Sequence, residues 1–413
     1  MGQGNSTPAY TVVPEGSITT PKGFKAAGLH CGLKKTTRHD LGAIVCEVPA
    51  AAAGVYTTNV FQAAPILVTK DSIGAGGVLR ALVVNSGNAN ACTGKQGEAD
   101  AYEMRSKFAE TIGVPAEHVA VASTGVIGEL LKMDCVRGGI AELPARLGST
   151  YEAADDFCQA ILTTDLVKKE VCVSVTVDGR TVHIAGASKG SGMIHPNMAT
   201  MLGFVTTDAA IGSETLHKLL RQATDLTFNM ITVDGDTSTN DMLVAMASGL
   251  AENQELQEGH PDLAAFAAGL RYVCEVLAKA IARDGEGATK LVEVQVRGAV
   301  SDEAAQAIAK TVIGSSLVKS AVFGADANWG RIIAAIGRAG QPVNPETVDI
   351  RLGDIVTLTQ SRPVVFDEEA ALVYLKGDTV VIHVDLNMGE GTATGWGCDL
   401  TYDYVRINAA YRT

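Results

Sequence analysis

The fold is decided by residues 171–208, VCVSVTVDGRTVHIAGASKGSGMIHPNMATMLGFVTTD. This stretch begins with two β-rich runs on either side of Asp178-Gly179, and an Asp-Gly pair in that position predicts a tight hairpin. Residues 186–199 then hold three glycines and a proline, a composition that suits neither a strand nor a helix. The strand pattern resumes at Thr200. We therefore expect Thr200 to lie where an irregular loop leads the chain into a sheet.

Outside this stretch, helical and strand patterns alternate along the chain. Apolar residues at helical spacing predict helices at 97–111, 127–142, 151–162, 213–228, 262–283 and 302–312. Alternation of apolar and polar residues predicts strands at 291–296, 347–358 and 379–386, and residues 404–413 alternate in the same way. The fold class is therefore mixed, α/β (α+β). A length of 413 residues fits one large layered domain or two or three smaller ones.

The composition is that of a compact, soluble protein, with 46% hydrophobic and 19% charged residues. The formal net charge of −13 has the wrong sign for binding phosphate backbones, so nucleic acid is not an expected partner. No apolar run approaches the roughly 18 residues of a membrane span, and no signal-peptide pattern opens the chain. The eight cysteines have no CxxC pairs and are interpreted as reduced thiols, which predicts a cytoplasmic protein.

The sequence predicts neither a metal nor another cofactor. The histidines have no HExxH spacing, and residues 85–94, NSGNANACTG, have neither GxGxxG spacing nor a Walker lysine. This segment is interpreted as a turn or as one wall of a polar substrate pocket. Residues 234–241, DGDTSTND, lack the spacing of an EF-hand and are interpreted as a polar loop rather than a metal site.

Thr200 is a candidate nucleophile. A threonine hydroxyl reacts poorly without a base, and a free α-amine on the same residue is one suitable base. The unperturbed pKa of such an amine, about 7.7 to 8.0, fits this role near neutral pH. Inside a chain, the amine exists only after the Ala199-Thr200 peptide bond is cleaved, and the small side chain of Ala199 leaves room for the hydroxyl to attack. On the local pattern alone, a threonine that simply opens a strand is the commoner interpretation.

Two further segments carry groups suited to catalysis or binding. In Ser123-Thr124-Gly125, after an apolar strand, backbone N–H groups and a hydroxyl can stabilise a developing negative charge, although a helix cap by Ser123 or Thr124 is the alternative. Glu286 lies between two glycines, where the backbone can approach a ligand closely and the carboxylate can point inward. The alternative is a solvated acid at the end of a helix.

Taken together, five segments closely resemble the ornithine acetyltransferase family. They are KGSGMIHPNMATML from Lys189, STGVIG from Ser123, NSGNANACTG from Asn85, DGEGATK from Asp284 and the terminal NAAYRT from Asn408. The resemblance covers nearly the whole chain. It implies self-cleavage between Ala199 and Thr200 into an α chain, 1–199, and a β chain, 200–413, that stay associated and share one core, with a smaller lobe in the C-terminal part. It also implies a layered α/β sandwich similar to that of amino-terminal-nucleophile hydrolases, with its own connectivity, and an assembly of two α and two β chains.

The resemblance also assigns roles to residues. Thr200 is the nucleophile, and Thr124 with Gly125 forms the oxyanion hole. The implied substrate contacts are Thr163, Lys189, Thr200, Glu286, Asn408 and Thr413. Thr164 takes the place of Thr163 if the alignment slips by one residue. His195 departs from the small or acidic residue usual in the family. A protonated His195 near the new amine would lower the pKa of that amine, whereas an exposed His195 would not affect it.

The activity implied by the resemblance is acyl transfer in arginine biosynthesis. The acetyl group of N2-acetyl-L-ornithine passes to Thr200 and then to L-glutamate, without a metal or prosthetic group. Family members with and without acetyl-CoA-dependent acetylation of glutamate share these motifs, so that second activity stays open. Two alternatives remain: an amino-terminal-nucleophile amidase or aminopeptidase, which passes the acyl group to water, and an uncleaved small-molecule binding protein.

Overall fold

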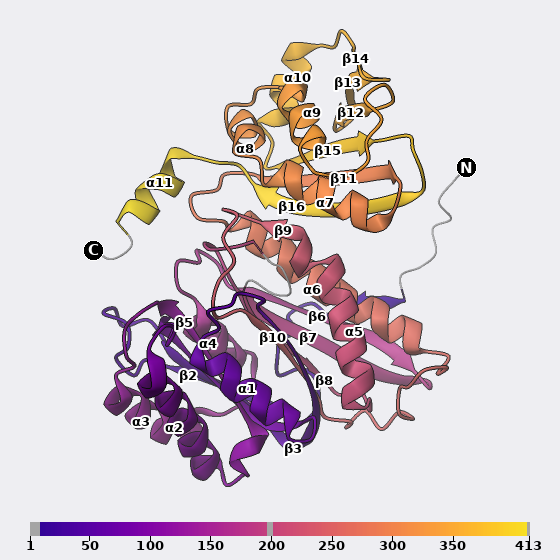
Figure 1. Ribbon diagram of the computed structural model, residues 1–413. Coiled ribbons are helices and arrows are strands. Elements are labelled where there is room, and N and C mark those ends of the chain that lie inside the picture. Colours follow the sequence, from indigo (N-terminus) through magenta and orange to yellow (C-terminus); the bar gives the residue numbers. More distant parts are fainter. Residues whose placement is uncertain (1–8, 196–200, 411–413) are drawn as a thin grey trace.

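The computed structural model describes residues 9–195 and 201–410. Ala199, Thr200 and Thr413 lie outside the described residues. Two β-sheets organise the structure, one in the larger body of the molecule and one in the upper lobe of Figure 1. The prediction of a mixed α/β fold is confirmed.

The first sheet has nine strands within the described residues, in the order β1-β6-β7-β8-β10-β3-β4-β5, with β2 paired to β3. The strand β3 reaches two partners on one edge, because its first half pairs with β2 and its second half with β10. The strands are β1 (Tyr10–Val12), β2 (Phe24–Leu29), β3 (Leu41–Tyr56), β4 (Val78–Asn88), β5 (Val119–Val126), β6 (Lys169–Val177), β7 (Arg180–Lys189), β8 (Leu202–Thr207) and β10 (Met242–Ala247).

The second sheet has seven strands within the described residues, in the order β14-β13-β12-β15-β11-β16-β9. They are β9 (Ile231–Thr232), β11 (Leu291–Ala299), β12 (Asp349–Leu352), β13 (Ile355–Thr359), β14 (Arg362–Pro363), β15 (Thr379–Asp385) and β16 (Gly391–Cys398). In Figure 1 this sheet and the helices α7 (Asp302–Ile313), α8 (Ser316–Phe323), α9 (Trp329–Gly337) and α10 (Glu368–Leu375) make up the upper lobe.

Helices cover both faces of the first sheet. On one face, Val273 and Leu277 of α6 (Leu263–Arg283) share a buried core with Val173 of β6 and Ile184 of β7. On the opposite face, Phe157 of α4 (Tyr151–Ile161) meets β8 through an edge-to-face contact with Phe204, with ring centroids 5.4 Å apart. The body also contains the helices α1 (Ala64–Gly74), α2 (Gly94–Ile112), α3 (Met133–Glu142) and α5 (Ser213–Leu226).

The structure confirms most of the predicted elements. The helices α2, α4, α5, α6 and α7 match the predicted ranges to within a few residues, and β11 and β15 match two of the predicted strands. The hairpin at Asp178-Gly179 joins β6 to β7, and both turn residues have positive φ (51° and 72°), as a type I′ turn requires.

Four expectations need correction. The helix expected from 127 begins only at Met133, because β5 continues to Val126 and a loop follows. The strand expected at 347–358 is a hairpin, β12 and β13, which turns at Gly353 with a φ of +57°. The strand β7 extends to Lys189, into the segment expected to be irregular from 186.

The fourth correction concerns the strand pattern at the end of the chain. The helix α11 (Tyr402–Ala409) occupies this region, and the Thr401 side chain caps it by accepting a hydrogen bond from the Tyr404 nitrogen. None of the described residues of α11 is buried, so the alternating pattern here does not mark a face packed on a sheet.

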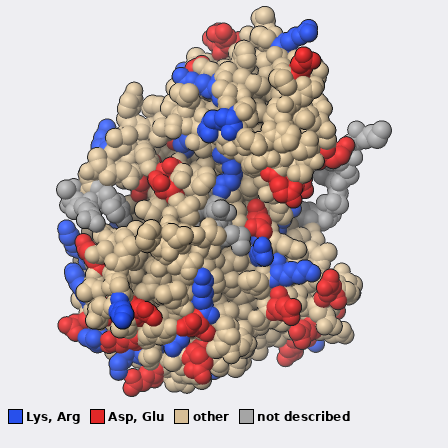
Figure 2. Space-filling view, viewed as in Figure 1, with Lys and Arg blue, Asp and Glu red and all other residues tan. Residues whose placement is uncertain are grey.

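The surface and the helices add two observations. Acidic and basic side chains are intermixed on the face seen in Figure 2. Among the described helices, none is long and apolar enough to cross a membrane.

Candidate functional site

A cavity of about 270 Å³ lies where the end of the first sheet meets loops from both halves of the chain. Its lining includes every predicted site residue that the structure describes: Thr124, Gly125, Thr163, Lys189, Glu286 and Asn408. Thr164 and Met201, the residue after Thr200, also line it. A larger cavity, of about 1000 Å³, lies against the second sheet and holds none of these described residues. The smaller cavity is therefore the candidate site.

Thr124 and Gly125 lie at the end of β5, where this strand runs parallel to β4. Gly125 has a φ of +135°, and a Cβ there would lie 2.5 Å from the Asn88 nitrogen, so the position accepts only glycine. The alternative of a helix cap is wrong, because β5 passes through both residues and the next helix begins at Met133.

The end of β5 around Thr124 is held by residues from two other segments. The Ser123 hydroxyl donates to the Asn85 side-chain oxygen at 2.6 Å, and the Asn240 side-chain nitrogen donates to the Ser123 carbonyl oxygen at 2.9 Å. Both contacts are buried. The segments 85–94 and 234–241 therefore hold the end of β5 that carries Thr124 and Gly125.

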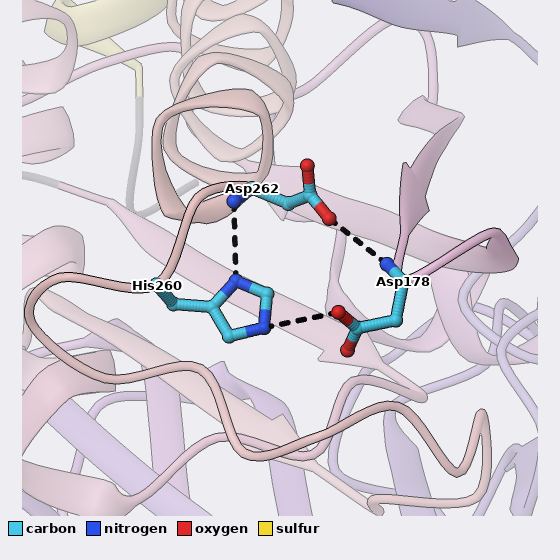
Figure 3. A group of neighbouring side chains, drawn as sticks. All are labelled: Asp178, His260 and Asp262. Atoms are coloured by element: carbon cyan, nitrogen blue, oxygen red, sulfur yellow. Dashed lines mark hydrogen bonds and ion pairs between the residues drawn. The ribbon is translucent and has the colours of Figure 1, made fainter.

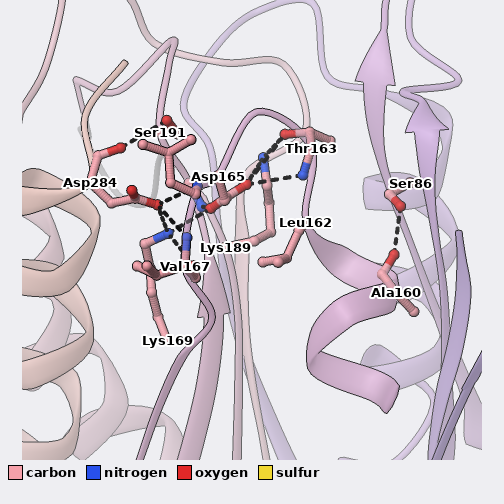
Figure 4. A network of polar contacts seen from close by, with 12 residues as sticks. Ser86, Ala160, Leu162, Thr163, Asp165, Val167, Lys169, Lys189, Ser191 and Asp284 are labelled. Carbon is pink, nitrogen blue, oxygen red and sulfur yellow. Dashed lines mark hydrogen bonds and ion pairs between the residues drawn. The ribbon is translucent and has the colours of Figure 1, made fainter. Parts of the chain in front are cut away.

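Lys189 belongs to a buried ionic network, shown in Figure 4. Its ammonium group donates to the Thr163 hydroxyl at 2.7 Å and lies 3.8 Å from a carboxylate oxygen of Asp165. Lys169, whose side chain is fully buried, pairs with Asp165 at 2.7 Å and with Asp284 at 2.6 Å. Of the two candidate threonines, Thr163 is thus the one bonded to Lys189, while Thr164 lines the same cavity.

The network also sets the protonation of Asp165. Burial alone would raise the pKa of this carboxyl, but the charges of Lys189 and Lys169 and the hydrogen bonds that it accepts outweigh burial and hold the pKa well below its usual range. Asp165 also accepts hydrogen bonds from the Thr163 and Gly190 nitrogens, at 3.0 and 2.7 Å. The charge on Asp165 therefore positions both the threonine and the loop that follows Lys189.

Glu286 faces the cavity from the loop after α6. The Asn408 side chain, on α11, donates to its carboxylate at 2.8 Å, and the Glu286 nitrogen donates to the Ser191 carbonyl oxygen at 2.9 Å. A Cβ on Gly192 would overlap the Glu286 carboxylate, so the glycine makes room for this side chain. The C-terminal helix thus contributes one wall of the site.

The polar loop 234–241 supports the segment that leads to Thr200. The Asp234 carboxylate accepts hydrogen bonds from the Met193 and Ile194 nitrogens, at 2.6 and 2.9 Å. The Thr237 hydroxyl donates to the His195 carbonyl oxygen at 2.8 Å. The acidic and hydroxyl groups of this loop are therefore used to hold residues 193–195.

His195 itself is partly buried, and its Nδ1 lies 3.0 Å from the Thr232 hydroxyl. Burial, reinforced by the charge of Lys310, lowers the pKa of His195 to about 4. The ring is accordingly neutral at neutral pH, and a positive charge on His195 is not available to act on a nearby amine.

One cluster among the described residues has the ligand spacing of a metal site, Asp178, His260 and Asp262 (Figure 3). Its groups already contact one another. The Asp178 nitrogen donates to the Asp262 carboxylate at 2.9 Å, and the His260 ring lies 3.3 Å from the Asp178 carboxylate. The cluster ties the β6–β7 turn to the start of α6 and is not part of the candidate site.

Comparison with known proteins places these motifs in one family. The model of the ArgJ family matches residues 25–413. This chain belongs to the ArgJ family. It is 60% identical over 407 residues to the arginine biosynthesis bifunctional protein ArgJ of Geobacillus kaustophilus, with 98% of each chain covered. It is 59% identical over 410 residues to the protein of the same name from Halalkalibacterium halodurans, with 99% of each covered.

A solved structure supports the same assignment. The crystal structure of arginine biosynthesis bifunctional protein ArgJ from Bacillus halodurans is 62% identical, with a TM-score of 0.51, and covers 51% of this chain and 100% of that chain. The resemblance to the family, and with it the prediction of an acyltransferase of arginine biosynthesis, is confirmed.

Sequence reasoning missed several residues of the site in this ArgJ family member. Lys169 carries no motif, and its neighbour Lys168 has the same residue type at the surface. Asp284 opens one of the segments that resemble the family, and Asp165 directly follows the two candidate threonines, but the sequence analysis assigned neither residue a role. Asp241 ends a loop interpreted only as polar, although the run of six apolar residues directly after it, Met242 to Ala247, was a signal that the loop leads into a buried strand.

Proposed function

We propose that this chain transfers the acetyl group of N2-acetyl-L-ornithine to L-glutamate through an acetyl ester on Thr200. The observation that carries the proposal is the cavity, which gathers Thr124, Gly125, Lys189 and Glu286 from distant parts of the chain and is also lined by Met201. Thr200 is covalently joined to Met201, and consecutive Cα atoms lie about 3.8 Å apart. The proposed nucleophile is therefore within one residue of the cavity wall.

The nucleophile is proposed to form by self-cleavage between Ala199 and Thr200. Cleavage yields chains of 199 and 214 residues, since 413 minus 199 is 214. In support, the whole solved chain from Bacillus halodurans corresponds to 51% of this chain, which is the proportion expected for one product. The free α-amine of Thr200 then serves as the base for its own hydroxyl.

The two products are proposed to stay associated and to share one core. Strand β7 of the first product pairs with β8 of the second over six residues, from Ile184 opposite Thr207 to Lys189 opposite Leu202. On the other side, β10 of the second product pairs with β3 of the first. The second sheet with α7 to α10 then forms the smaller lobe, and two copies of each product form the proposed assembly.

The charged groups suit amino-acid substrates. We assign Lys189 to the substrate carboxylate and Glu286 to an ammonium group, with Thr163, Asn408 and Thr413 completing the contacts. The Thr124 hydroxyl and the Gly125 nitrogen stabilise the oxyanion, a role in which one donor contributes roughly 2.7–4 kcal/mol in other enzymes. A cavity of about 270 Å³ has room for one amino-acid derivative at a time, which favours a two-stage exchange over direct transfer between two bound substrates.

The location is proposed to be the cytoplasm. All eight cysteines lie in the described part of the chain, and all are free thiols. Unpaired thiols in this number are typical of a reducing compartment.

The test is an intact-mass measurement under denaturing conditions. Wild-type protein should give two species, and Thr200→Ala should give one species of 42.9 kDa. Acetylornithine and glutamate should then support acetyl transfer faster than hydrolysis. Hydrolysis alone would favour the amidase alternative, and a wild-type chain that stays intact would contradict the proposal. A parallel assay with acetyl-CoA and glutamate, without acetylornithine, decides whether the second activity is present.

A further inference from the structure

The larger cavity, of about 1000 Å³, has no role in the proposed reaction. It lies against one face of the second sheet, and its lining combines side chains of β11, β12, β15 and β16 with Arg271, Glu275 and Lys279 of α6. Cavities of roughly 300–1,000 Å³ are typical of sites that bind small molecules. The side chains on the sheet indicate which kind of molecule this cavity would hold.

A row of four polar side chains crosses the sheet at the floor of this cavity. Arg351 of β12 lies opposite His383 of β15. His383 in turn lies opposite Gln295 of β11, which lies opposite Thr394 of β16. All four residues line the cavity and are partly buried. Residues that lie opposite each other in a ladder have their side chains on the same face of the sheet, so the row presents hydrogen-bond donors side by side.

The cavity wall carries both acidic and basic groups, but the charged groups left without a partner are basic. Each acidic side chain of the lining takes part in a hydrogen bond or an ion pair; these are Glu275, Glu293, Asp302, Asp349 and Asp385. Lys279 and Arg297 are paired as well. Among the described residues, Arg271, Arg351 and His383 have neither a hydrogen-bond nor an ion-pair partner. The uncompensated charge in the cavity is therefore positive.

The two unpaired groups of the row, Arg351 and His383, face each other directly. Residues opposite each other in an antiparallel ladder have Cα atoms about 4.5–5.5 Å apart, and like charges in this position are destabilising. The pKa of His383 is accordingly lowered, by burial and by the charges of Arg351 and Arg297, which Glu293 and Asp354 offset only in part. An anion bound beside these two side chains would neutralise the charge of Arg351 and favour protonation of His383.

We infer that this row binds a small anion through a carboxylate or phosphate group. The planar guanidinium group of Arg351 can donate two parallel hydrogen bonds, which match two oxygens of either group. His383, Gln295 and Thr394 supply further donors along the same line. The inference goes beyond the proposed function, because the linings of the two cavities share no described residue and the acetyl transfer uses none of this row.

The test is calorimetric titration of the full-length protein with two probe anions, inorganic phosphate and succinate, at constant ionic strength. Wild type should bind at least one of them saturably, and the anion that binds more tightly identifies the recognised group as phosphate or carboxylate. In Arg351→Gln, this binding should weaken by about tenfold or more, because a hydrogen bond to a charged group is lost. Arg351→Lys, which keeps the charge but loses the paired donors, should bind with intermediate affinity.

Arg297→Gln is the matched control. It removes the same charge from the same cavity, but from an arginine that already pairs with Asp385 at 2.6 Å, so it should weaken binding much less. Without an anion, Arg351→Gln should unfold at the wild-type temperature or above it, because no described side chain loses a partner. The inference is overturned if wild type binds neither anion, if Arg351→Gln binds like wild type, or if Arg297→Gln loses as much affinity as Arg351→Gln. A markedly lower unfolding temperature for Arg351→Gln would also overturn it, because Arg351 would then be structural.

Discussion

Replacing Lys169 with methionine should destabilise the protein strongly. Methionine has a similar length but no charge, so Lys169→Met leaves Asp165 and Asp284 in a buried pocket without the cation that lies 2.7 and 2.6 Å from them. Removing one partner of a buried ion pair costs about 3–5 kcal/mol of unfolding free energy. We expect a loss in this range from equilibrium unfolding in denaturant.

The adjacent lysine supplies the control. Lys168 also pairs with two carboxylates, of Asp155 and Glu170, but its side chain is 30% exposed. Ion pairs in contact with water contribute about 0–1 kcal/mol, so Lys168→Met should cost no more than that. Similar losses for the two variants, or a loss below about 1 kcal/mol for Lys169→Met, would refute the view that the buried network stabilises this region.

The pH dependence provides a second readout of the same network. The folded-state pKa of Asp165 is lowered, so its contribution to stability is complete above the ordinary aspartate pKa of about 3.9 and is lost as the pH falls toward the folded-state value. The stability difference between wild type and Lys169→Met should therefore persist at neutral pH and shrink below about pH 3.9. A difference that grows on acidification would contradict the assignment of Asp165 as a carboxylate held by lysines.

Three other predictions can be tested separately. Gly192→Ala should raise KM for acetylornithine by about tenfold or more, because the added methyl group displaces the Glu286 carboxylate and a hydrogen bond to a charged group contributes about 1.5–3 kcal/mol. Gly138→Ala, whose methyl group meets no described atom within 4 Å, should leave KM unchanged. His195 should titrate by NMR with a pKa of about 4. Because the unfolded chain binds this proton more readily, the free energy of unfolding should fall as the pH is lowered from about 6.5 to about 4. The fall should be smaller in His195→Gln. Of the eight thiols, the exposed Cys92 should react first with a disulfide reagent, and Cys92→Ser should abolish the fast phase.

The parts of the fold that could be predicted from the sequence are those in which a buried face requires apolar residues at regular spacing. The helices α5 and α6 pack one face against the core, and the hairpin at Asp178-Gly179 needs only local turn chemistry, so each is visible in a short window of sequence. The helix α11 was mistaken for a strand because it buries none of its described residues, so no apolar face at helical spacing competes with the alternating pattern of its sequence. The boundary at Met133 was missed because the loop after β5, residues 127–132, has a sequence pattern that resembles a helix.

The residues of the candidate site also fall into two groups, those that a local motif predicts and those that only the fold brings together. Thr124, Gly125, Lys189 and Glu286 stand in long, ordered motifs, and the structure brings them to one cavity. The contacts that hold these residues in place join parts of the chain that are far apart in sequence. Lys169 and Asp284 are separated by 115 residues, and no local pattern encodes such a pair. The ionic network could be found only once the fold placed its members together.

The strand order of the first sheet has a consequence for the order in which folding and the proposed self-cleavage would occur. The strands β8 and β10 come from the part after residue 200, yet they lie between β7 and β3, both from the part before it. Without β8 and β10, the first part would leave the facing edges of β7 and β3 unpaired, and unpaired sheet edges favour aggregation. If the proposed self-cleavage takes place, the chain is therefore expected to fold before the Ala199-Thr200 bond breaks. Residues 1–199 and 200–413 produced as separate chains should assemble poorly. After denaturation, a chain that has already been cleaved should also recover less native structure than the uncleaved Thr200→Ala chain.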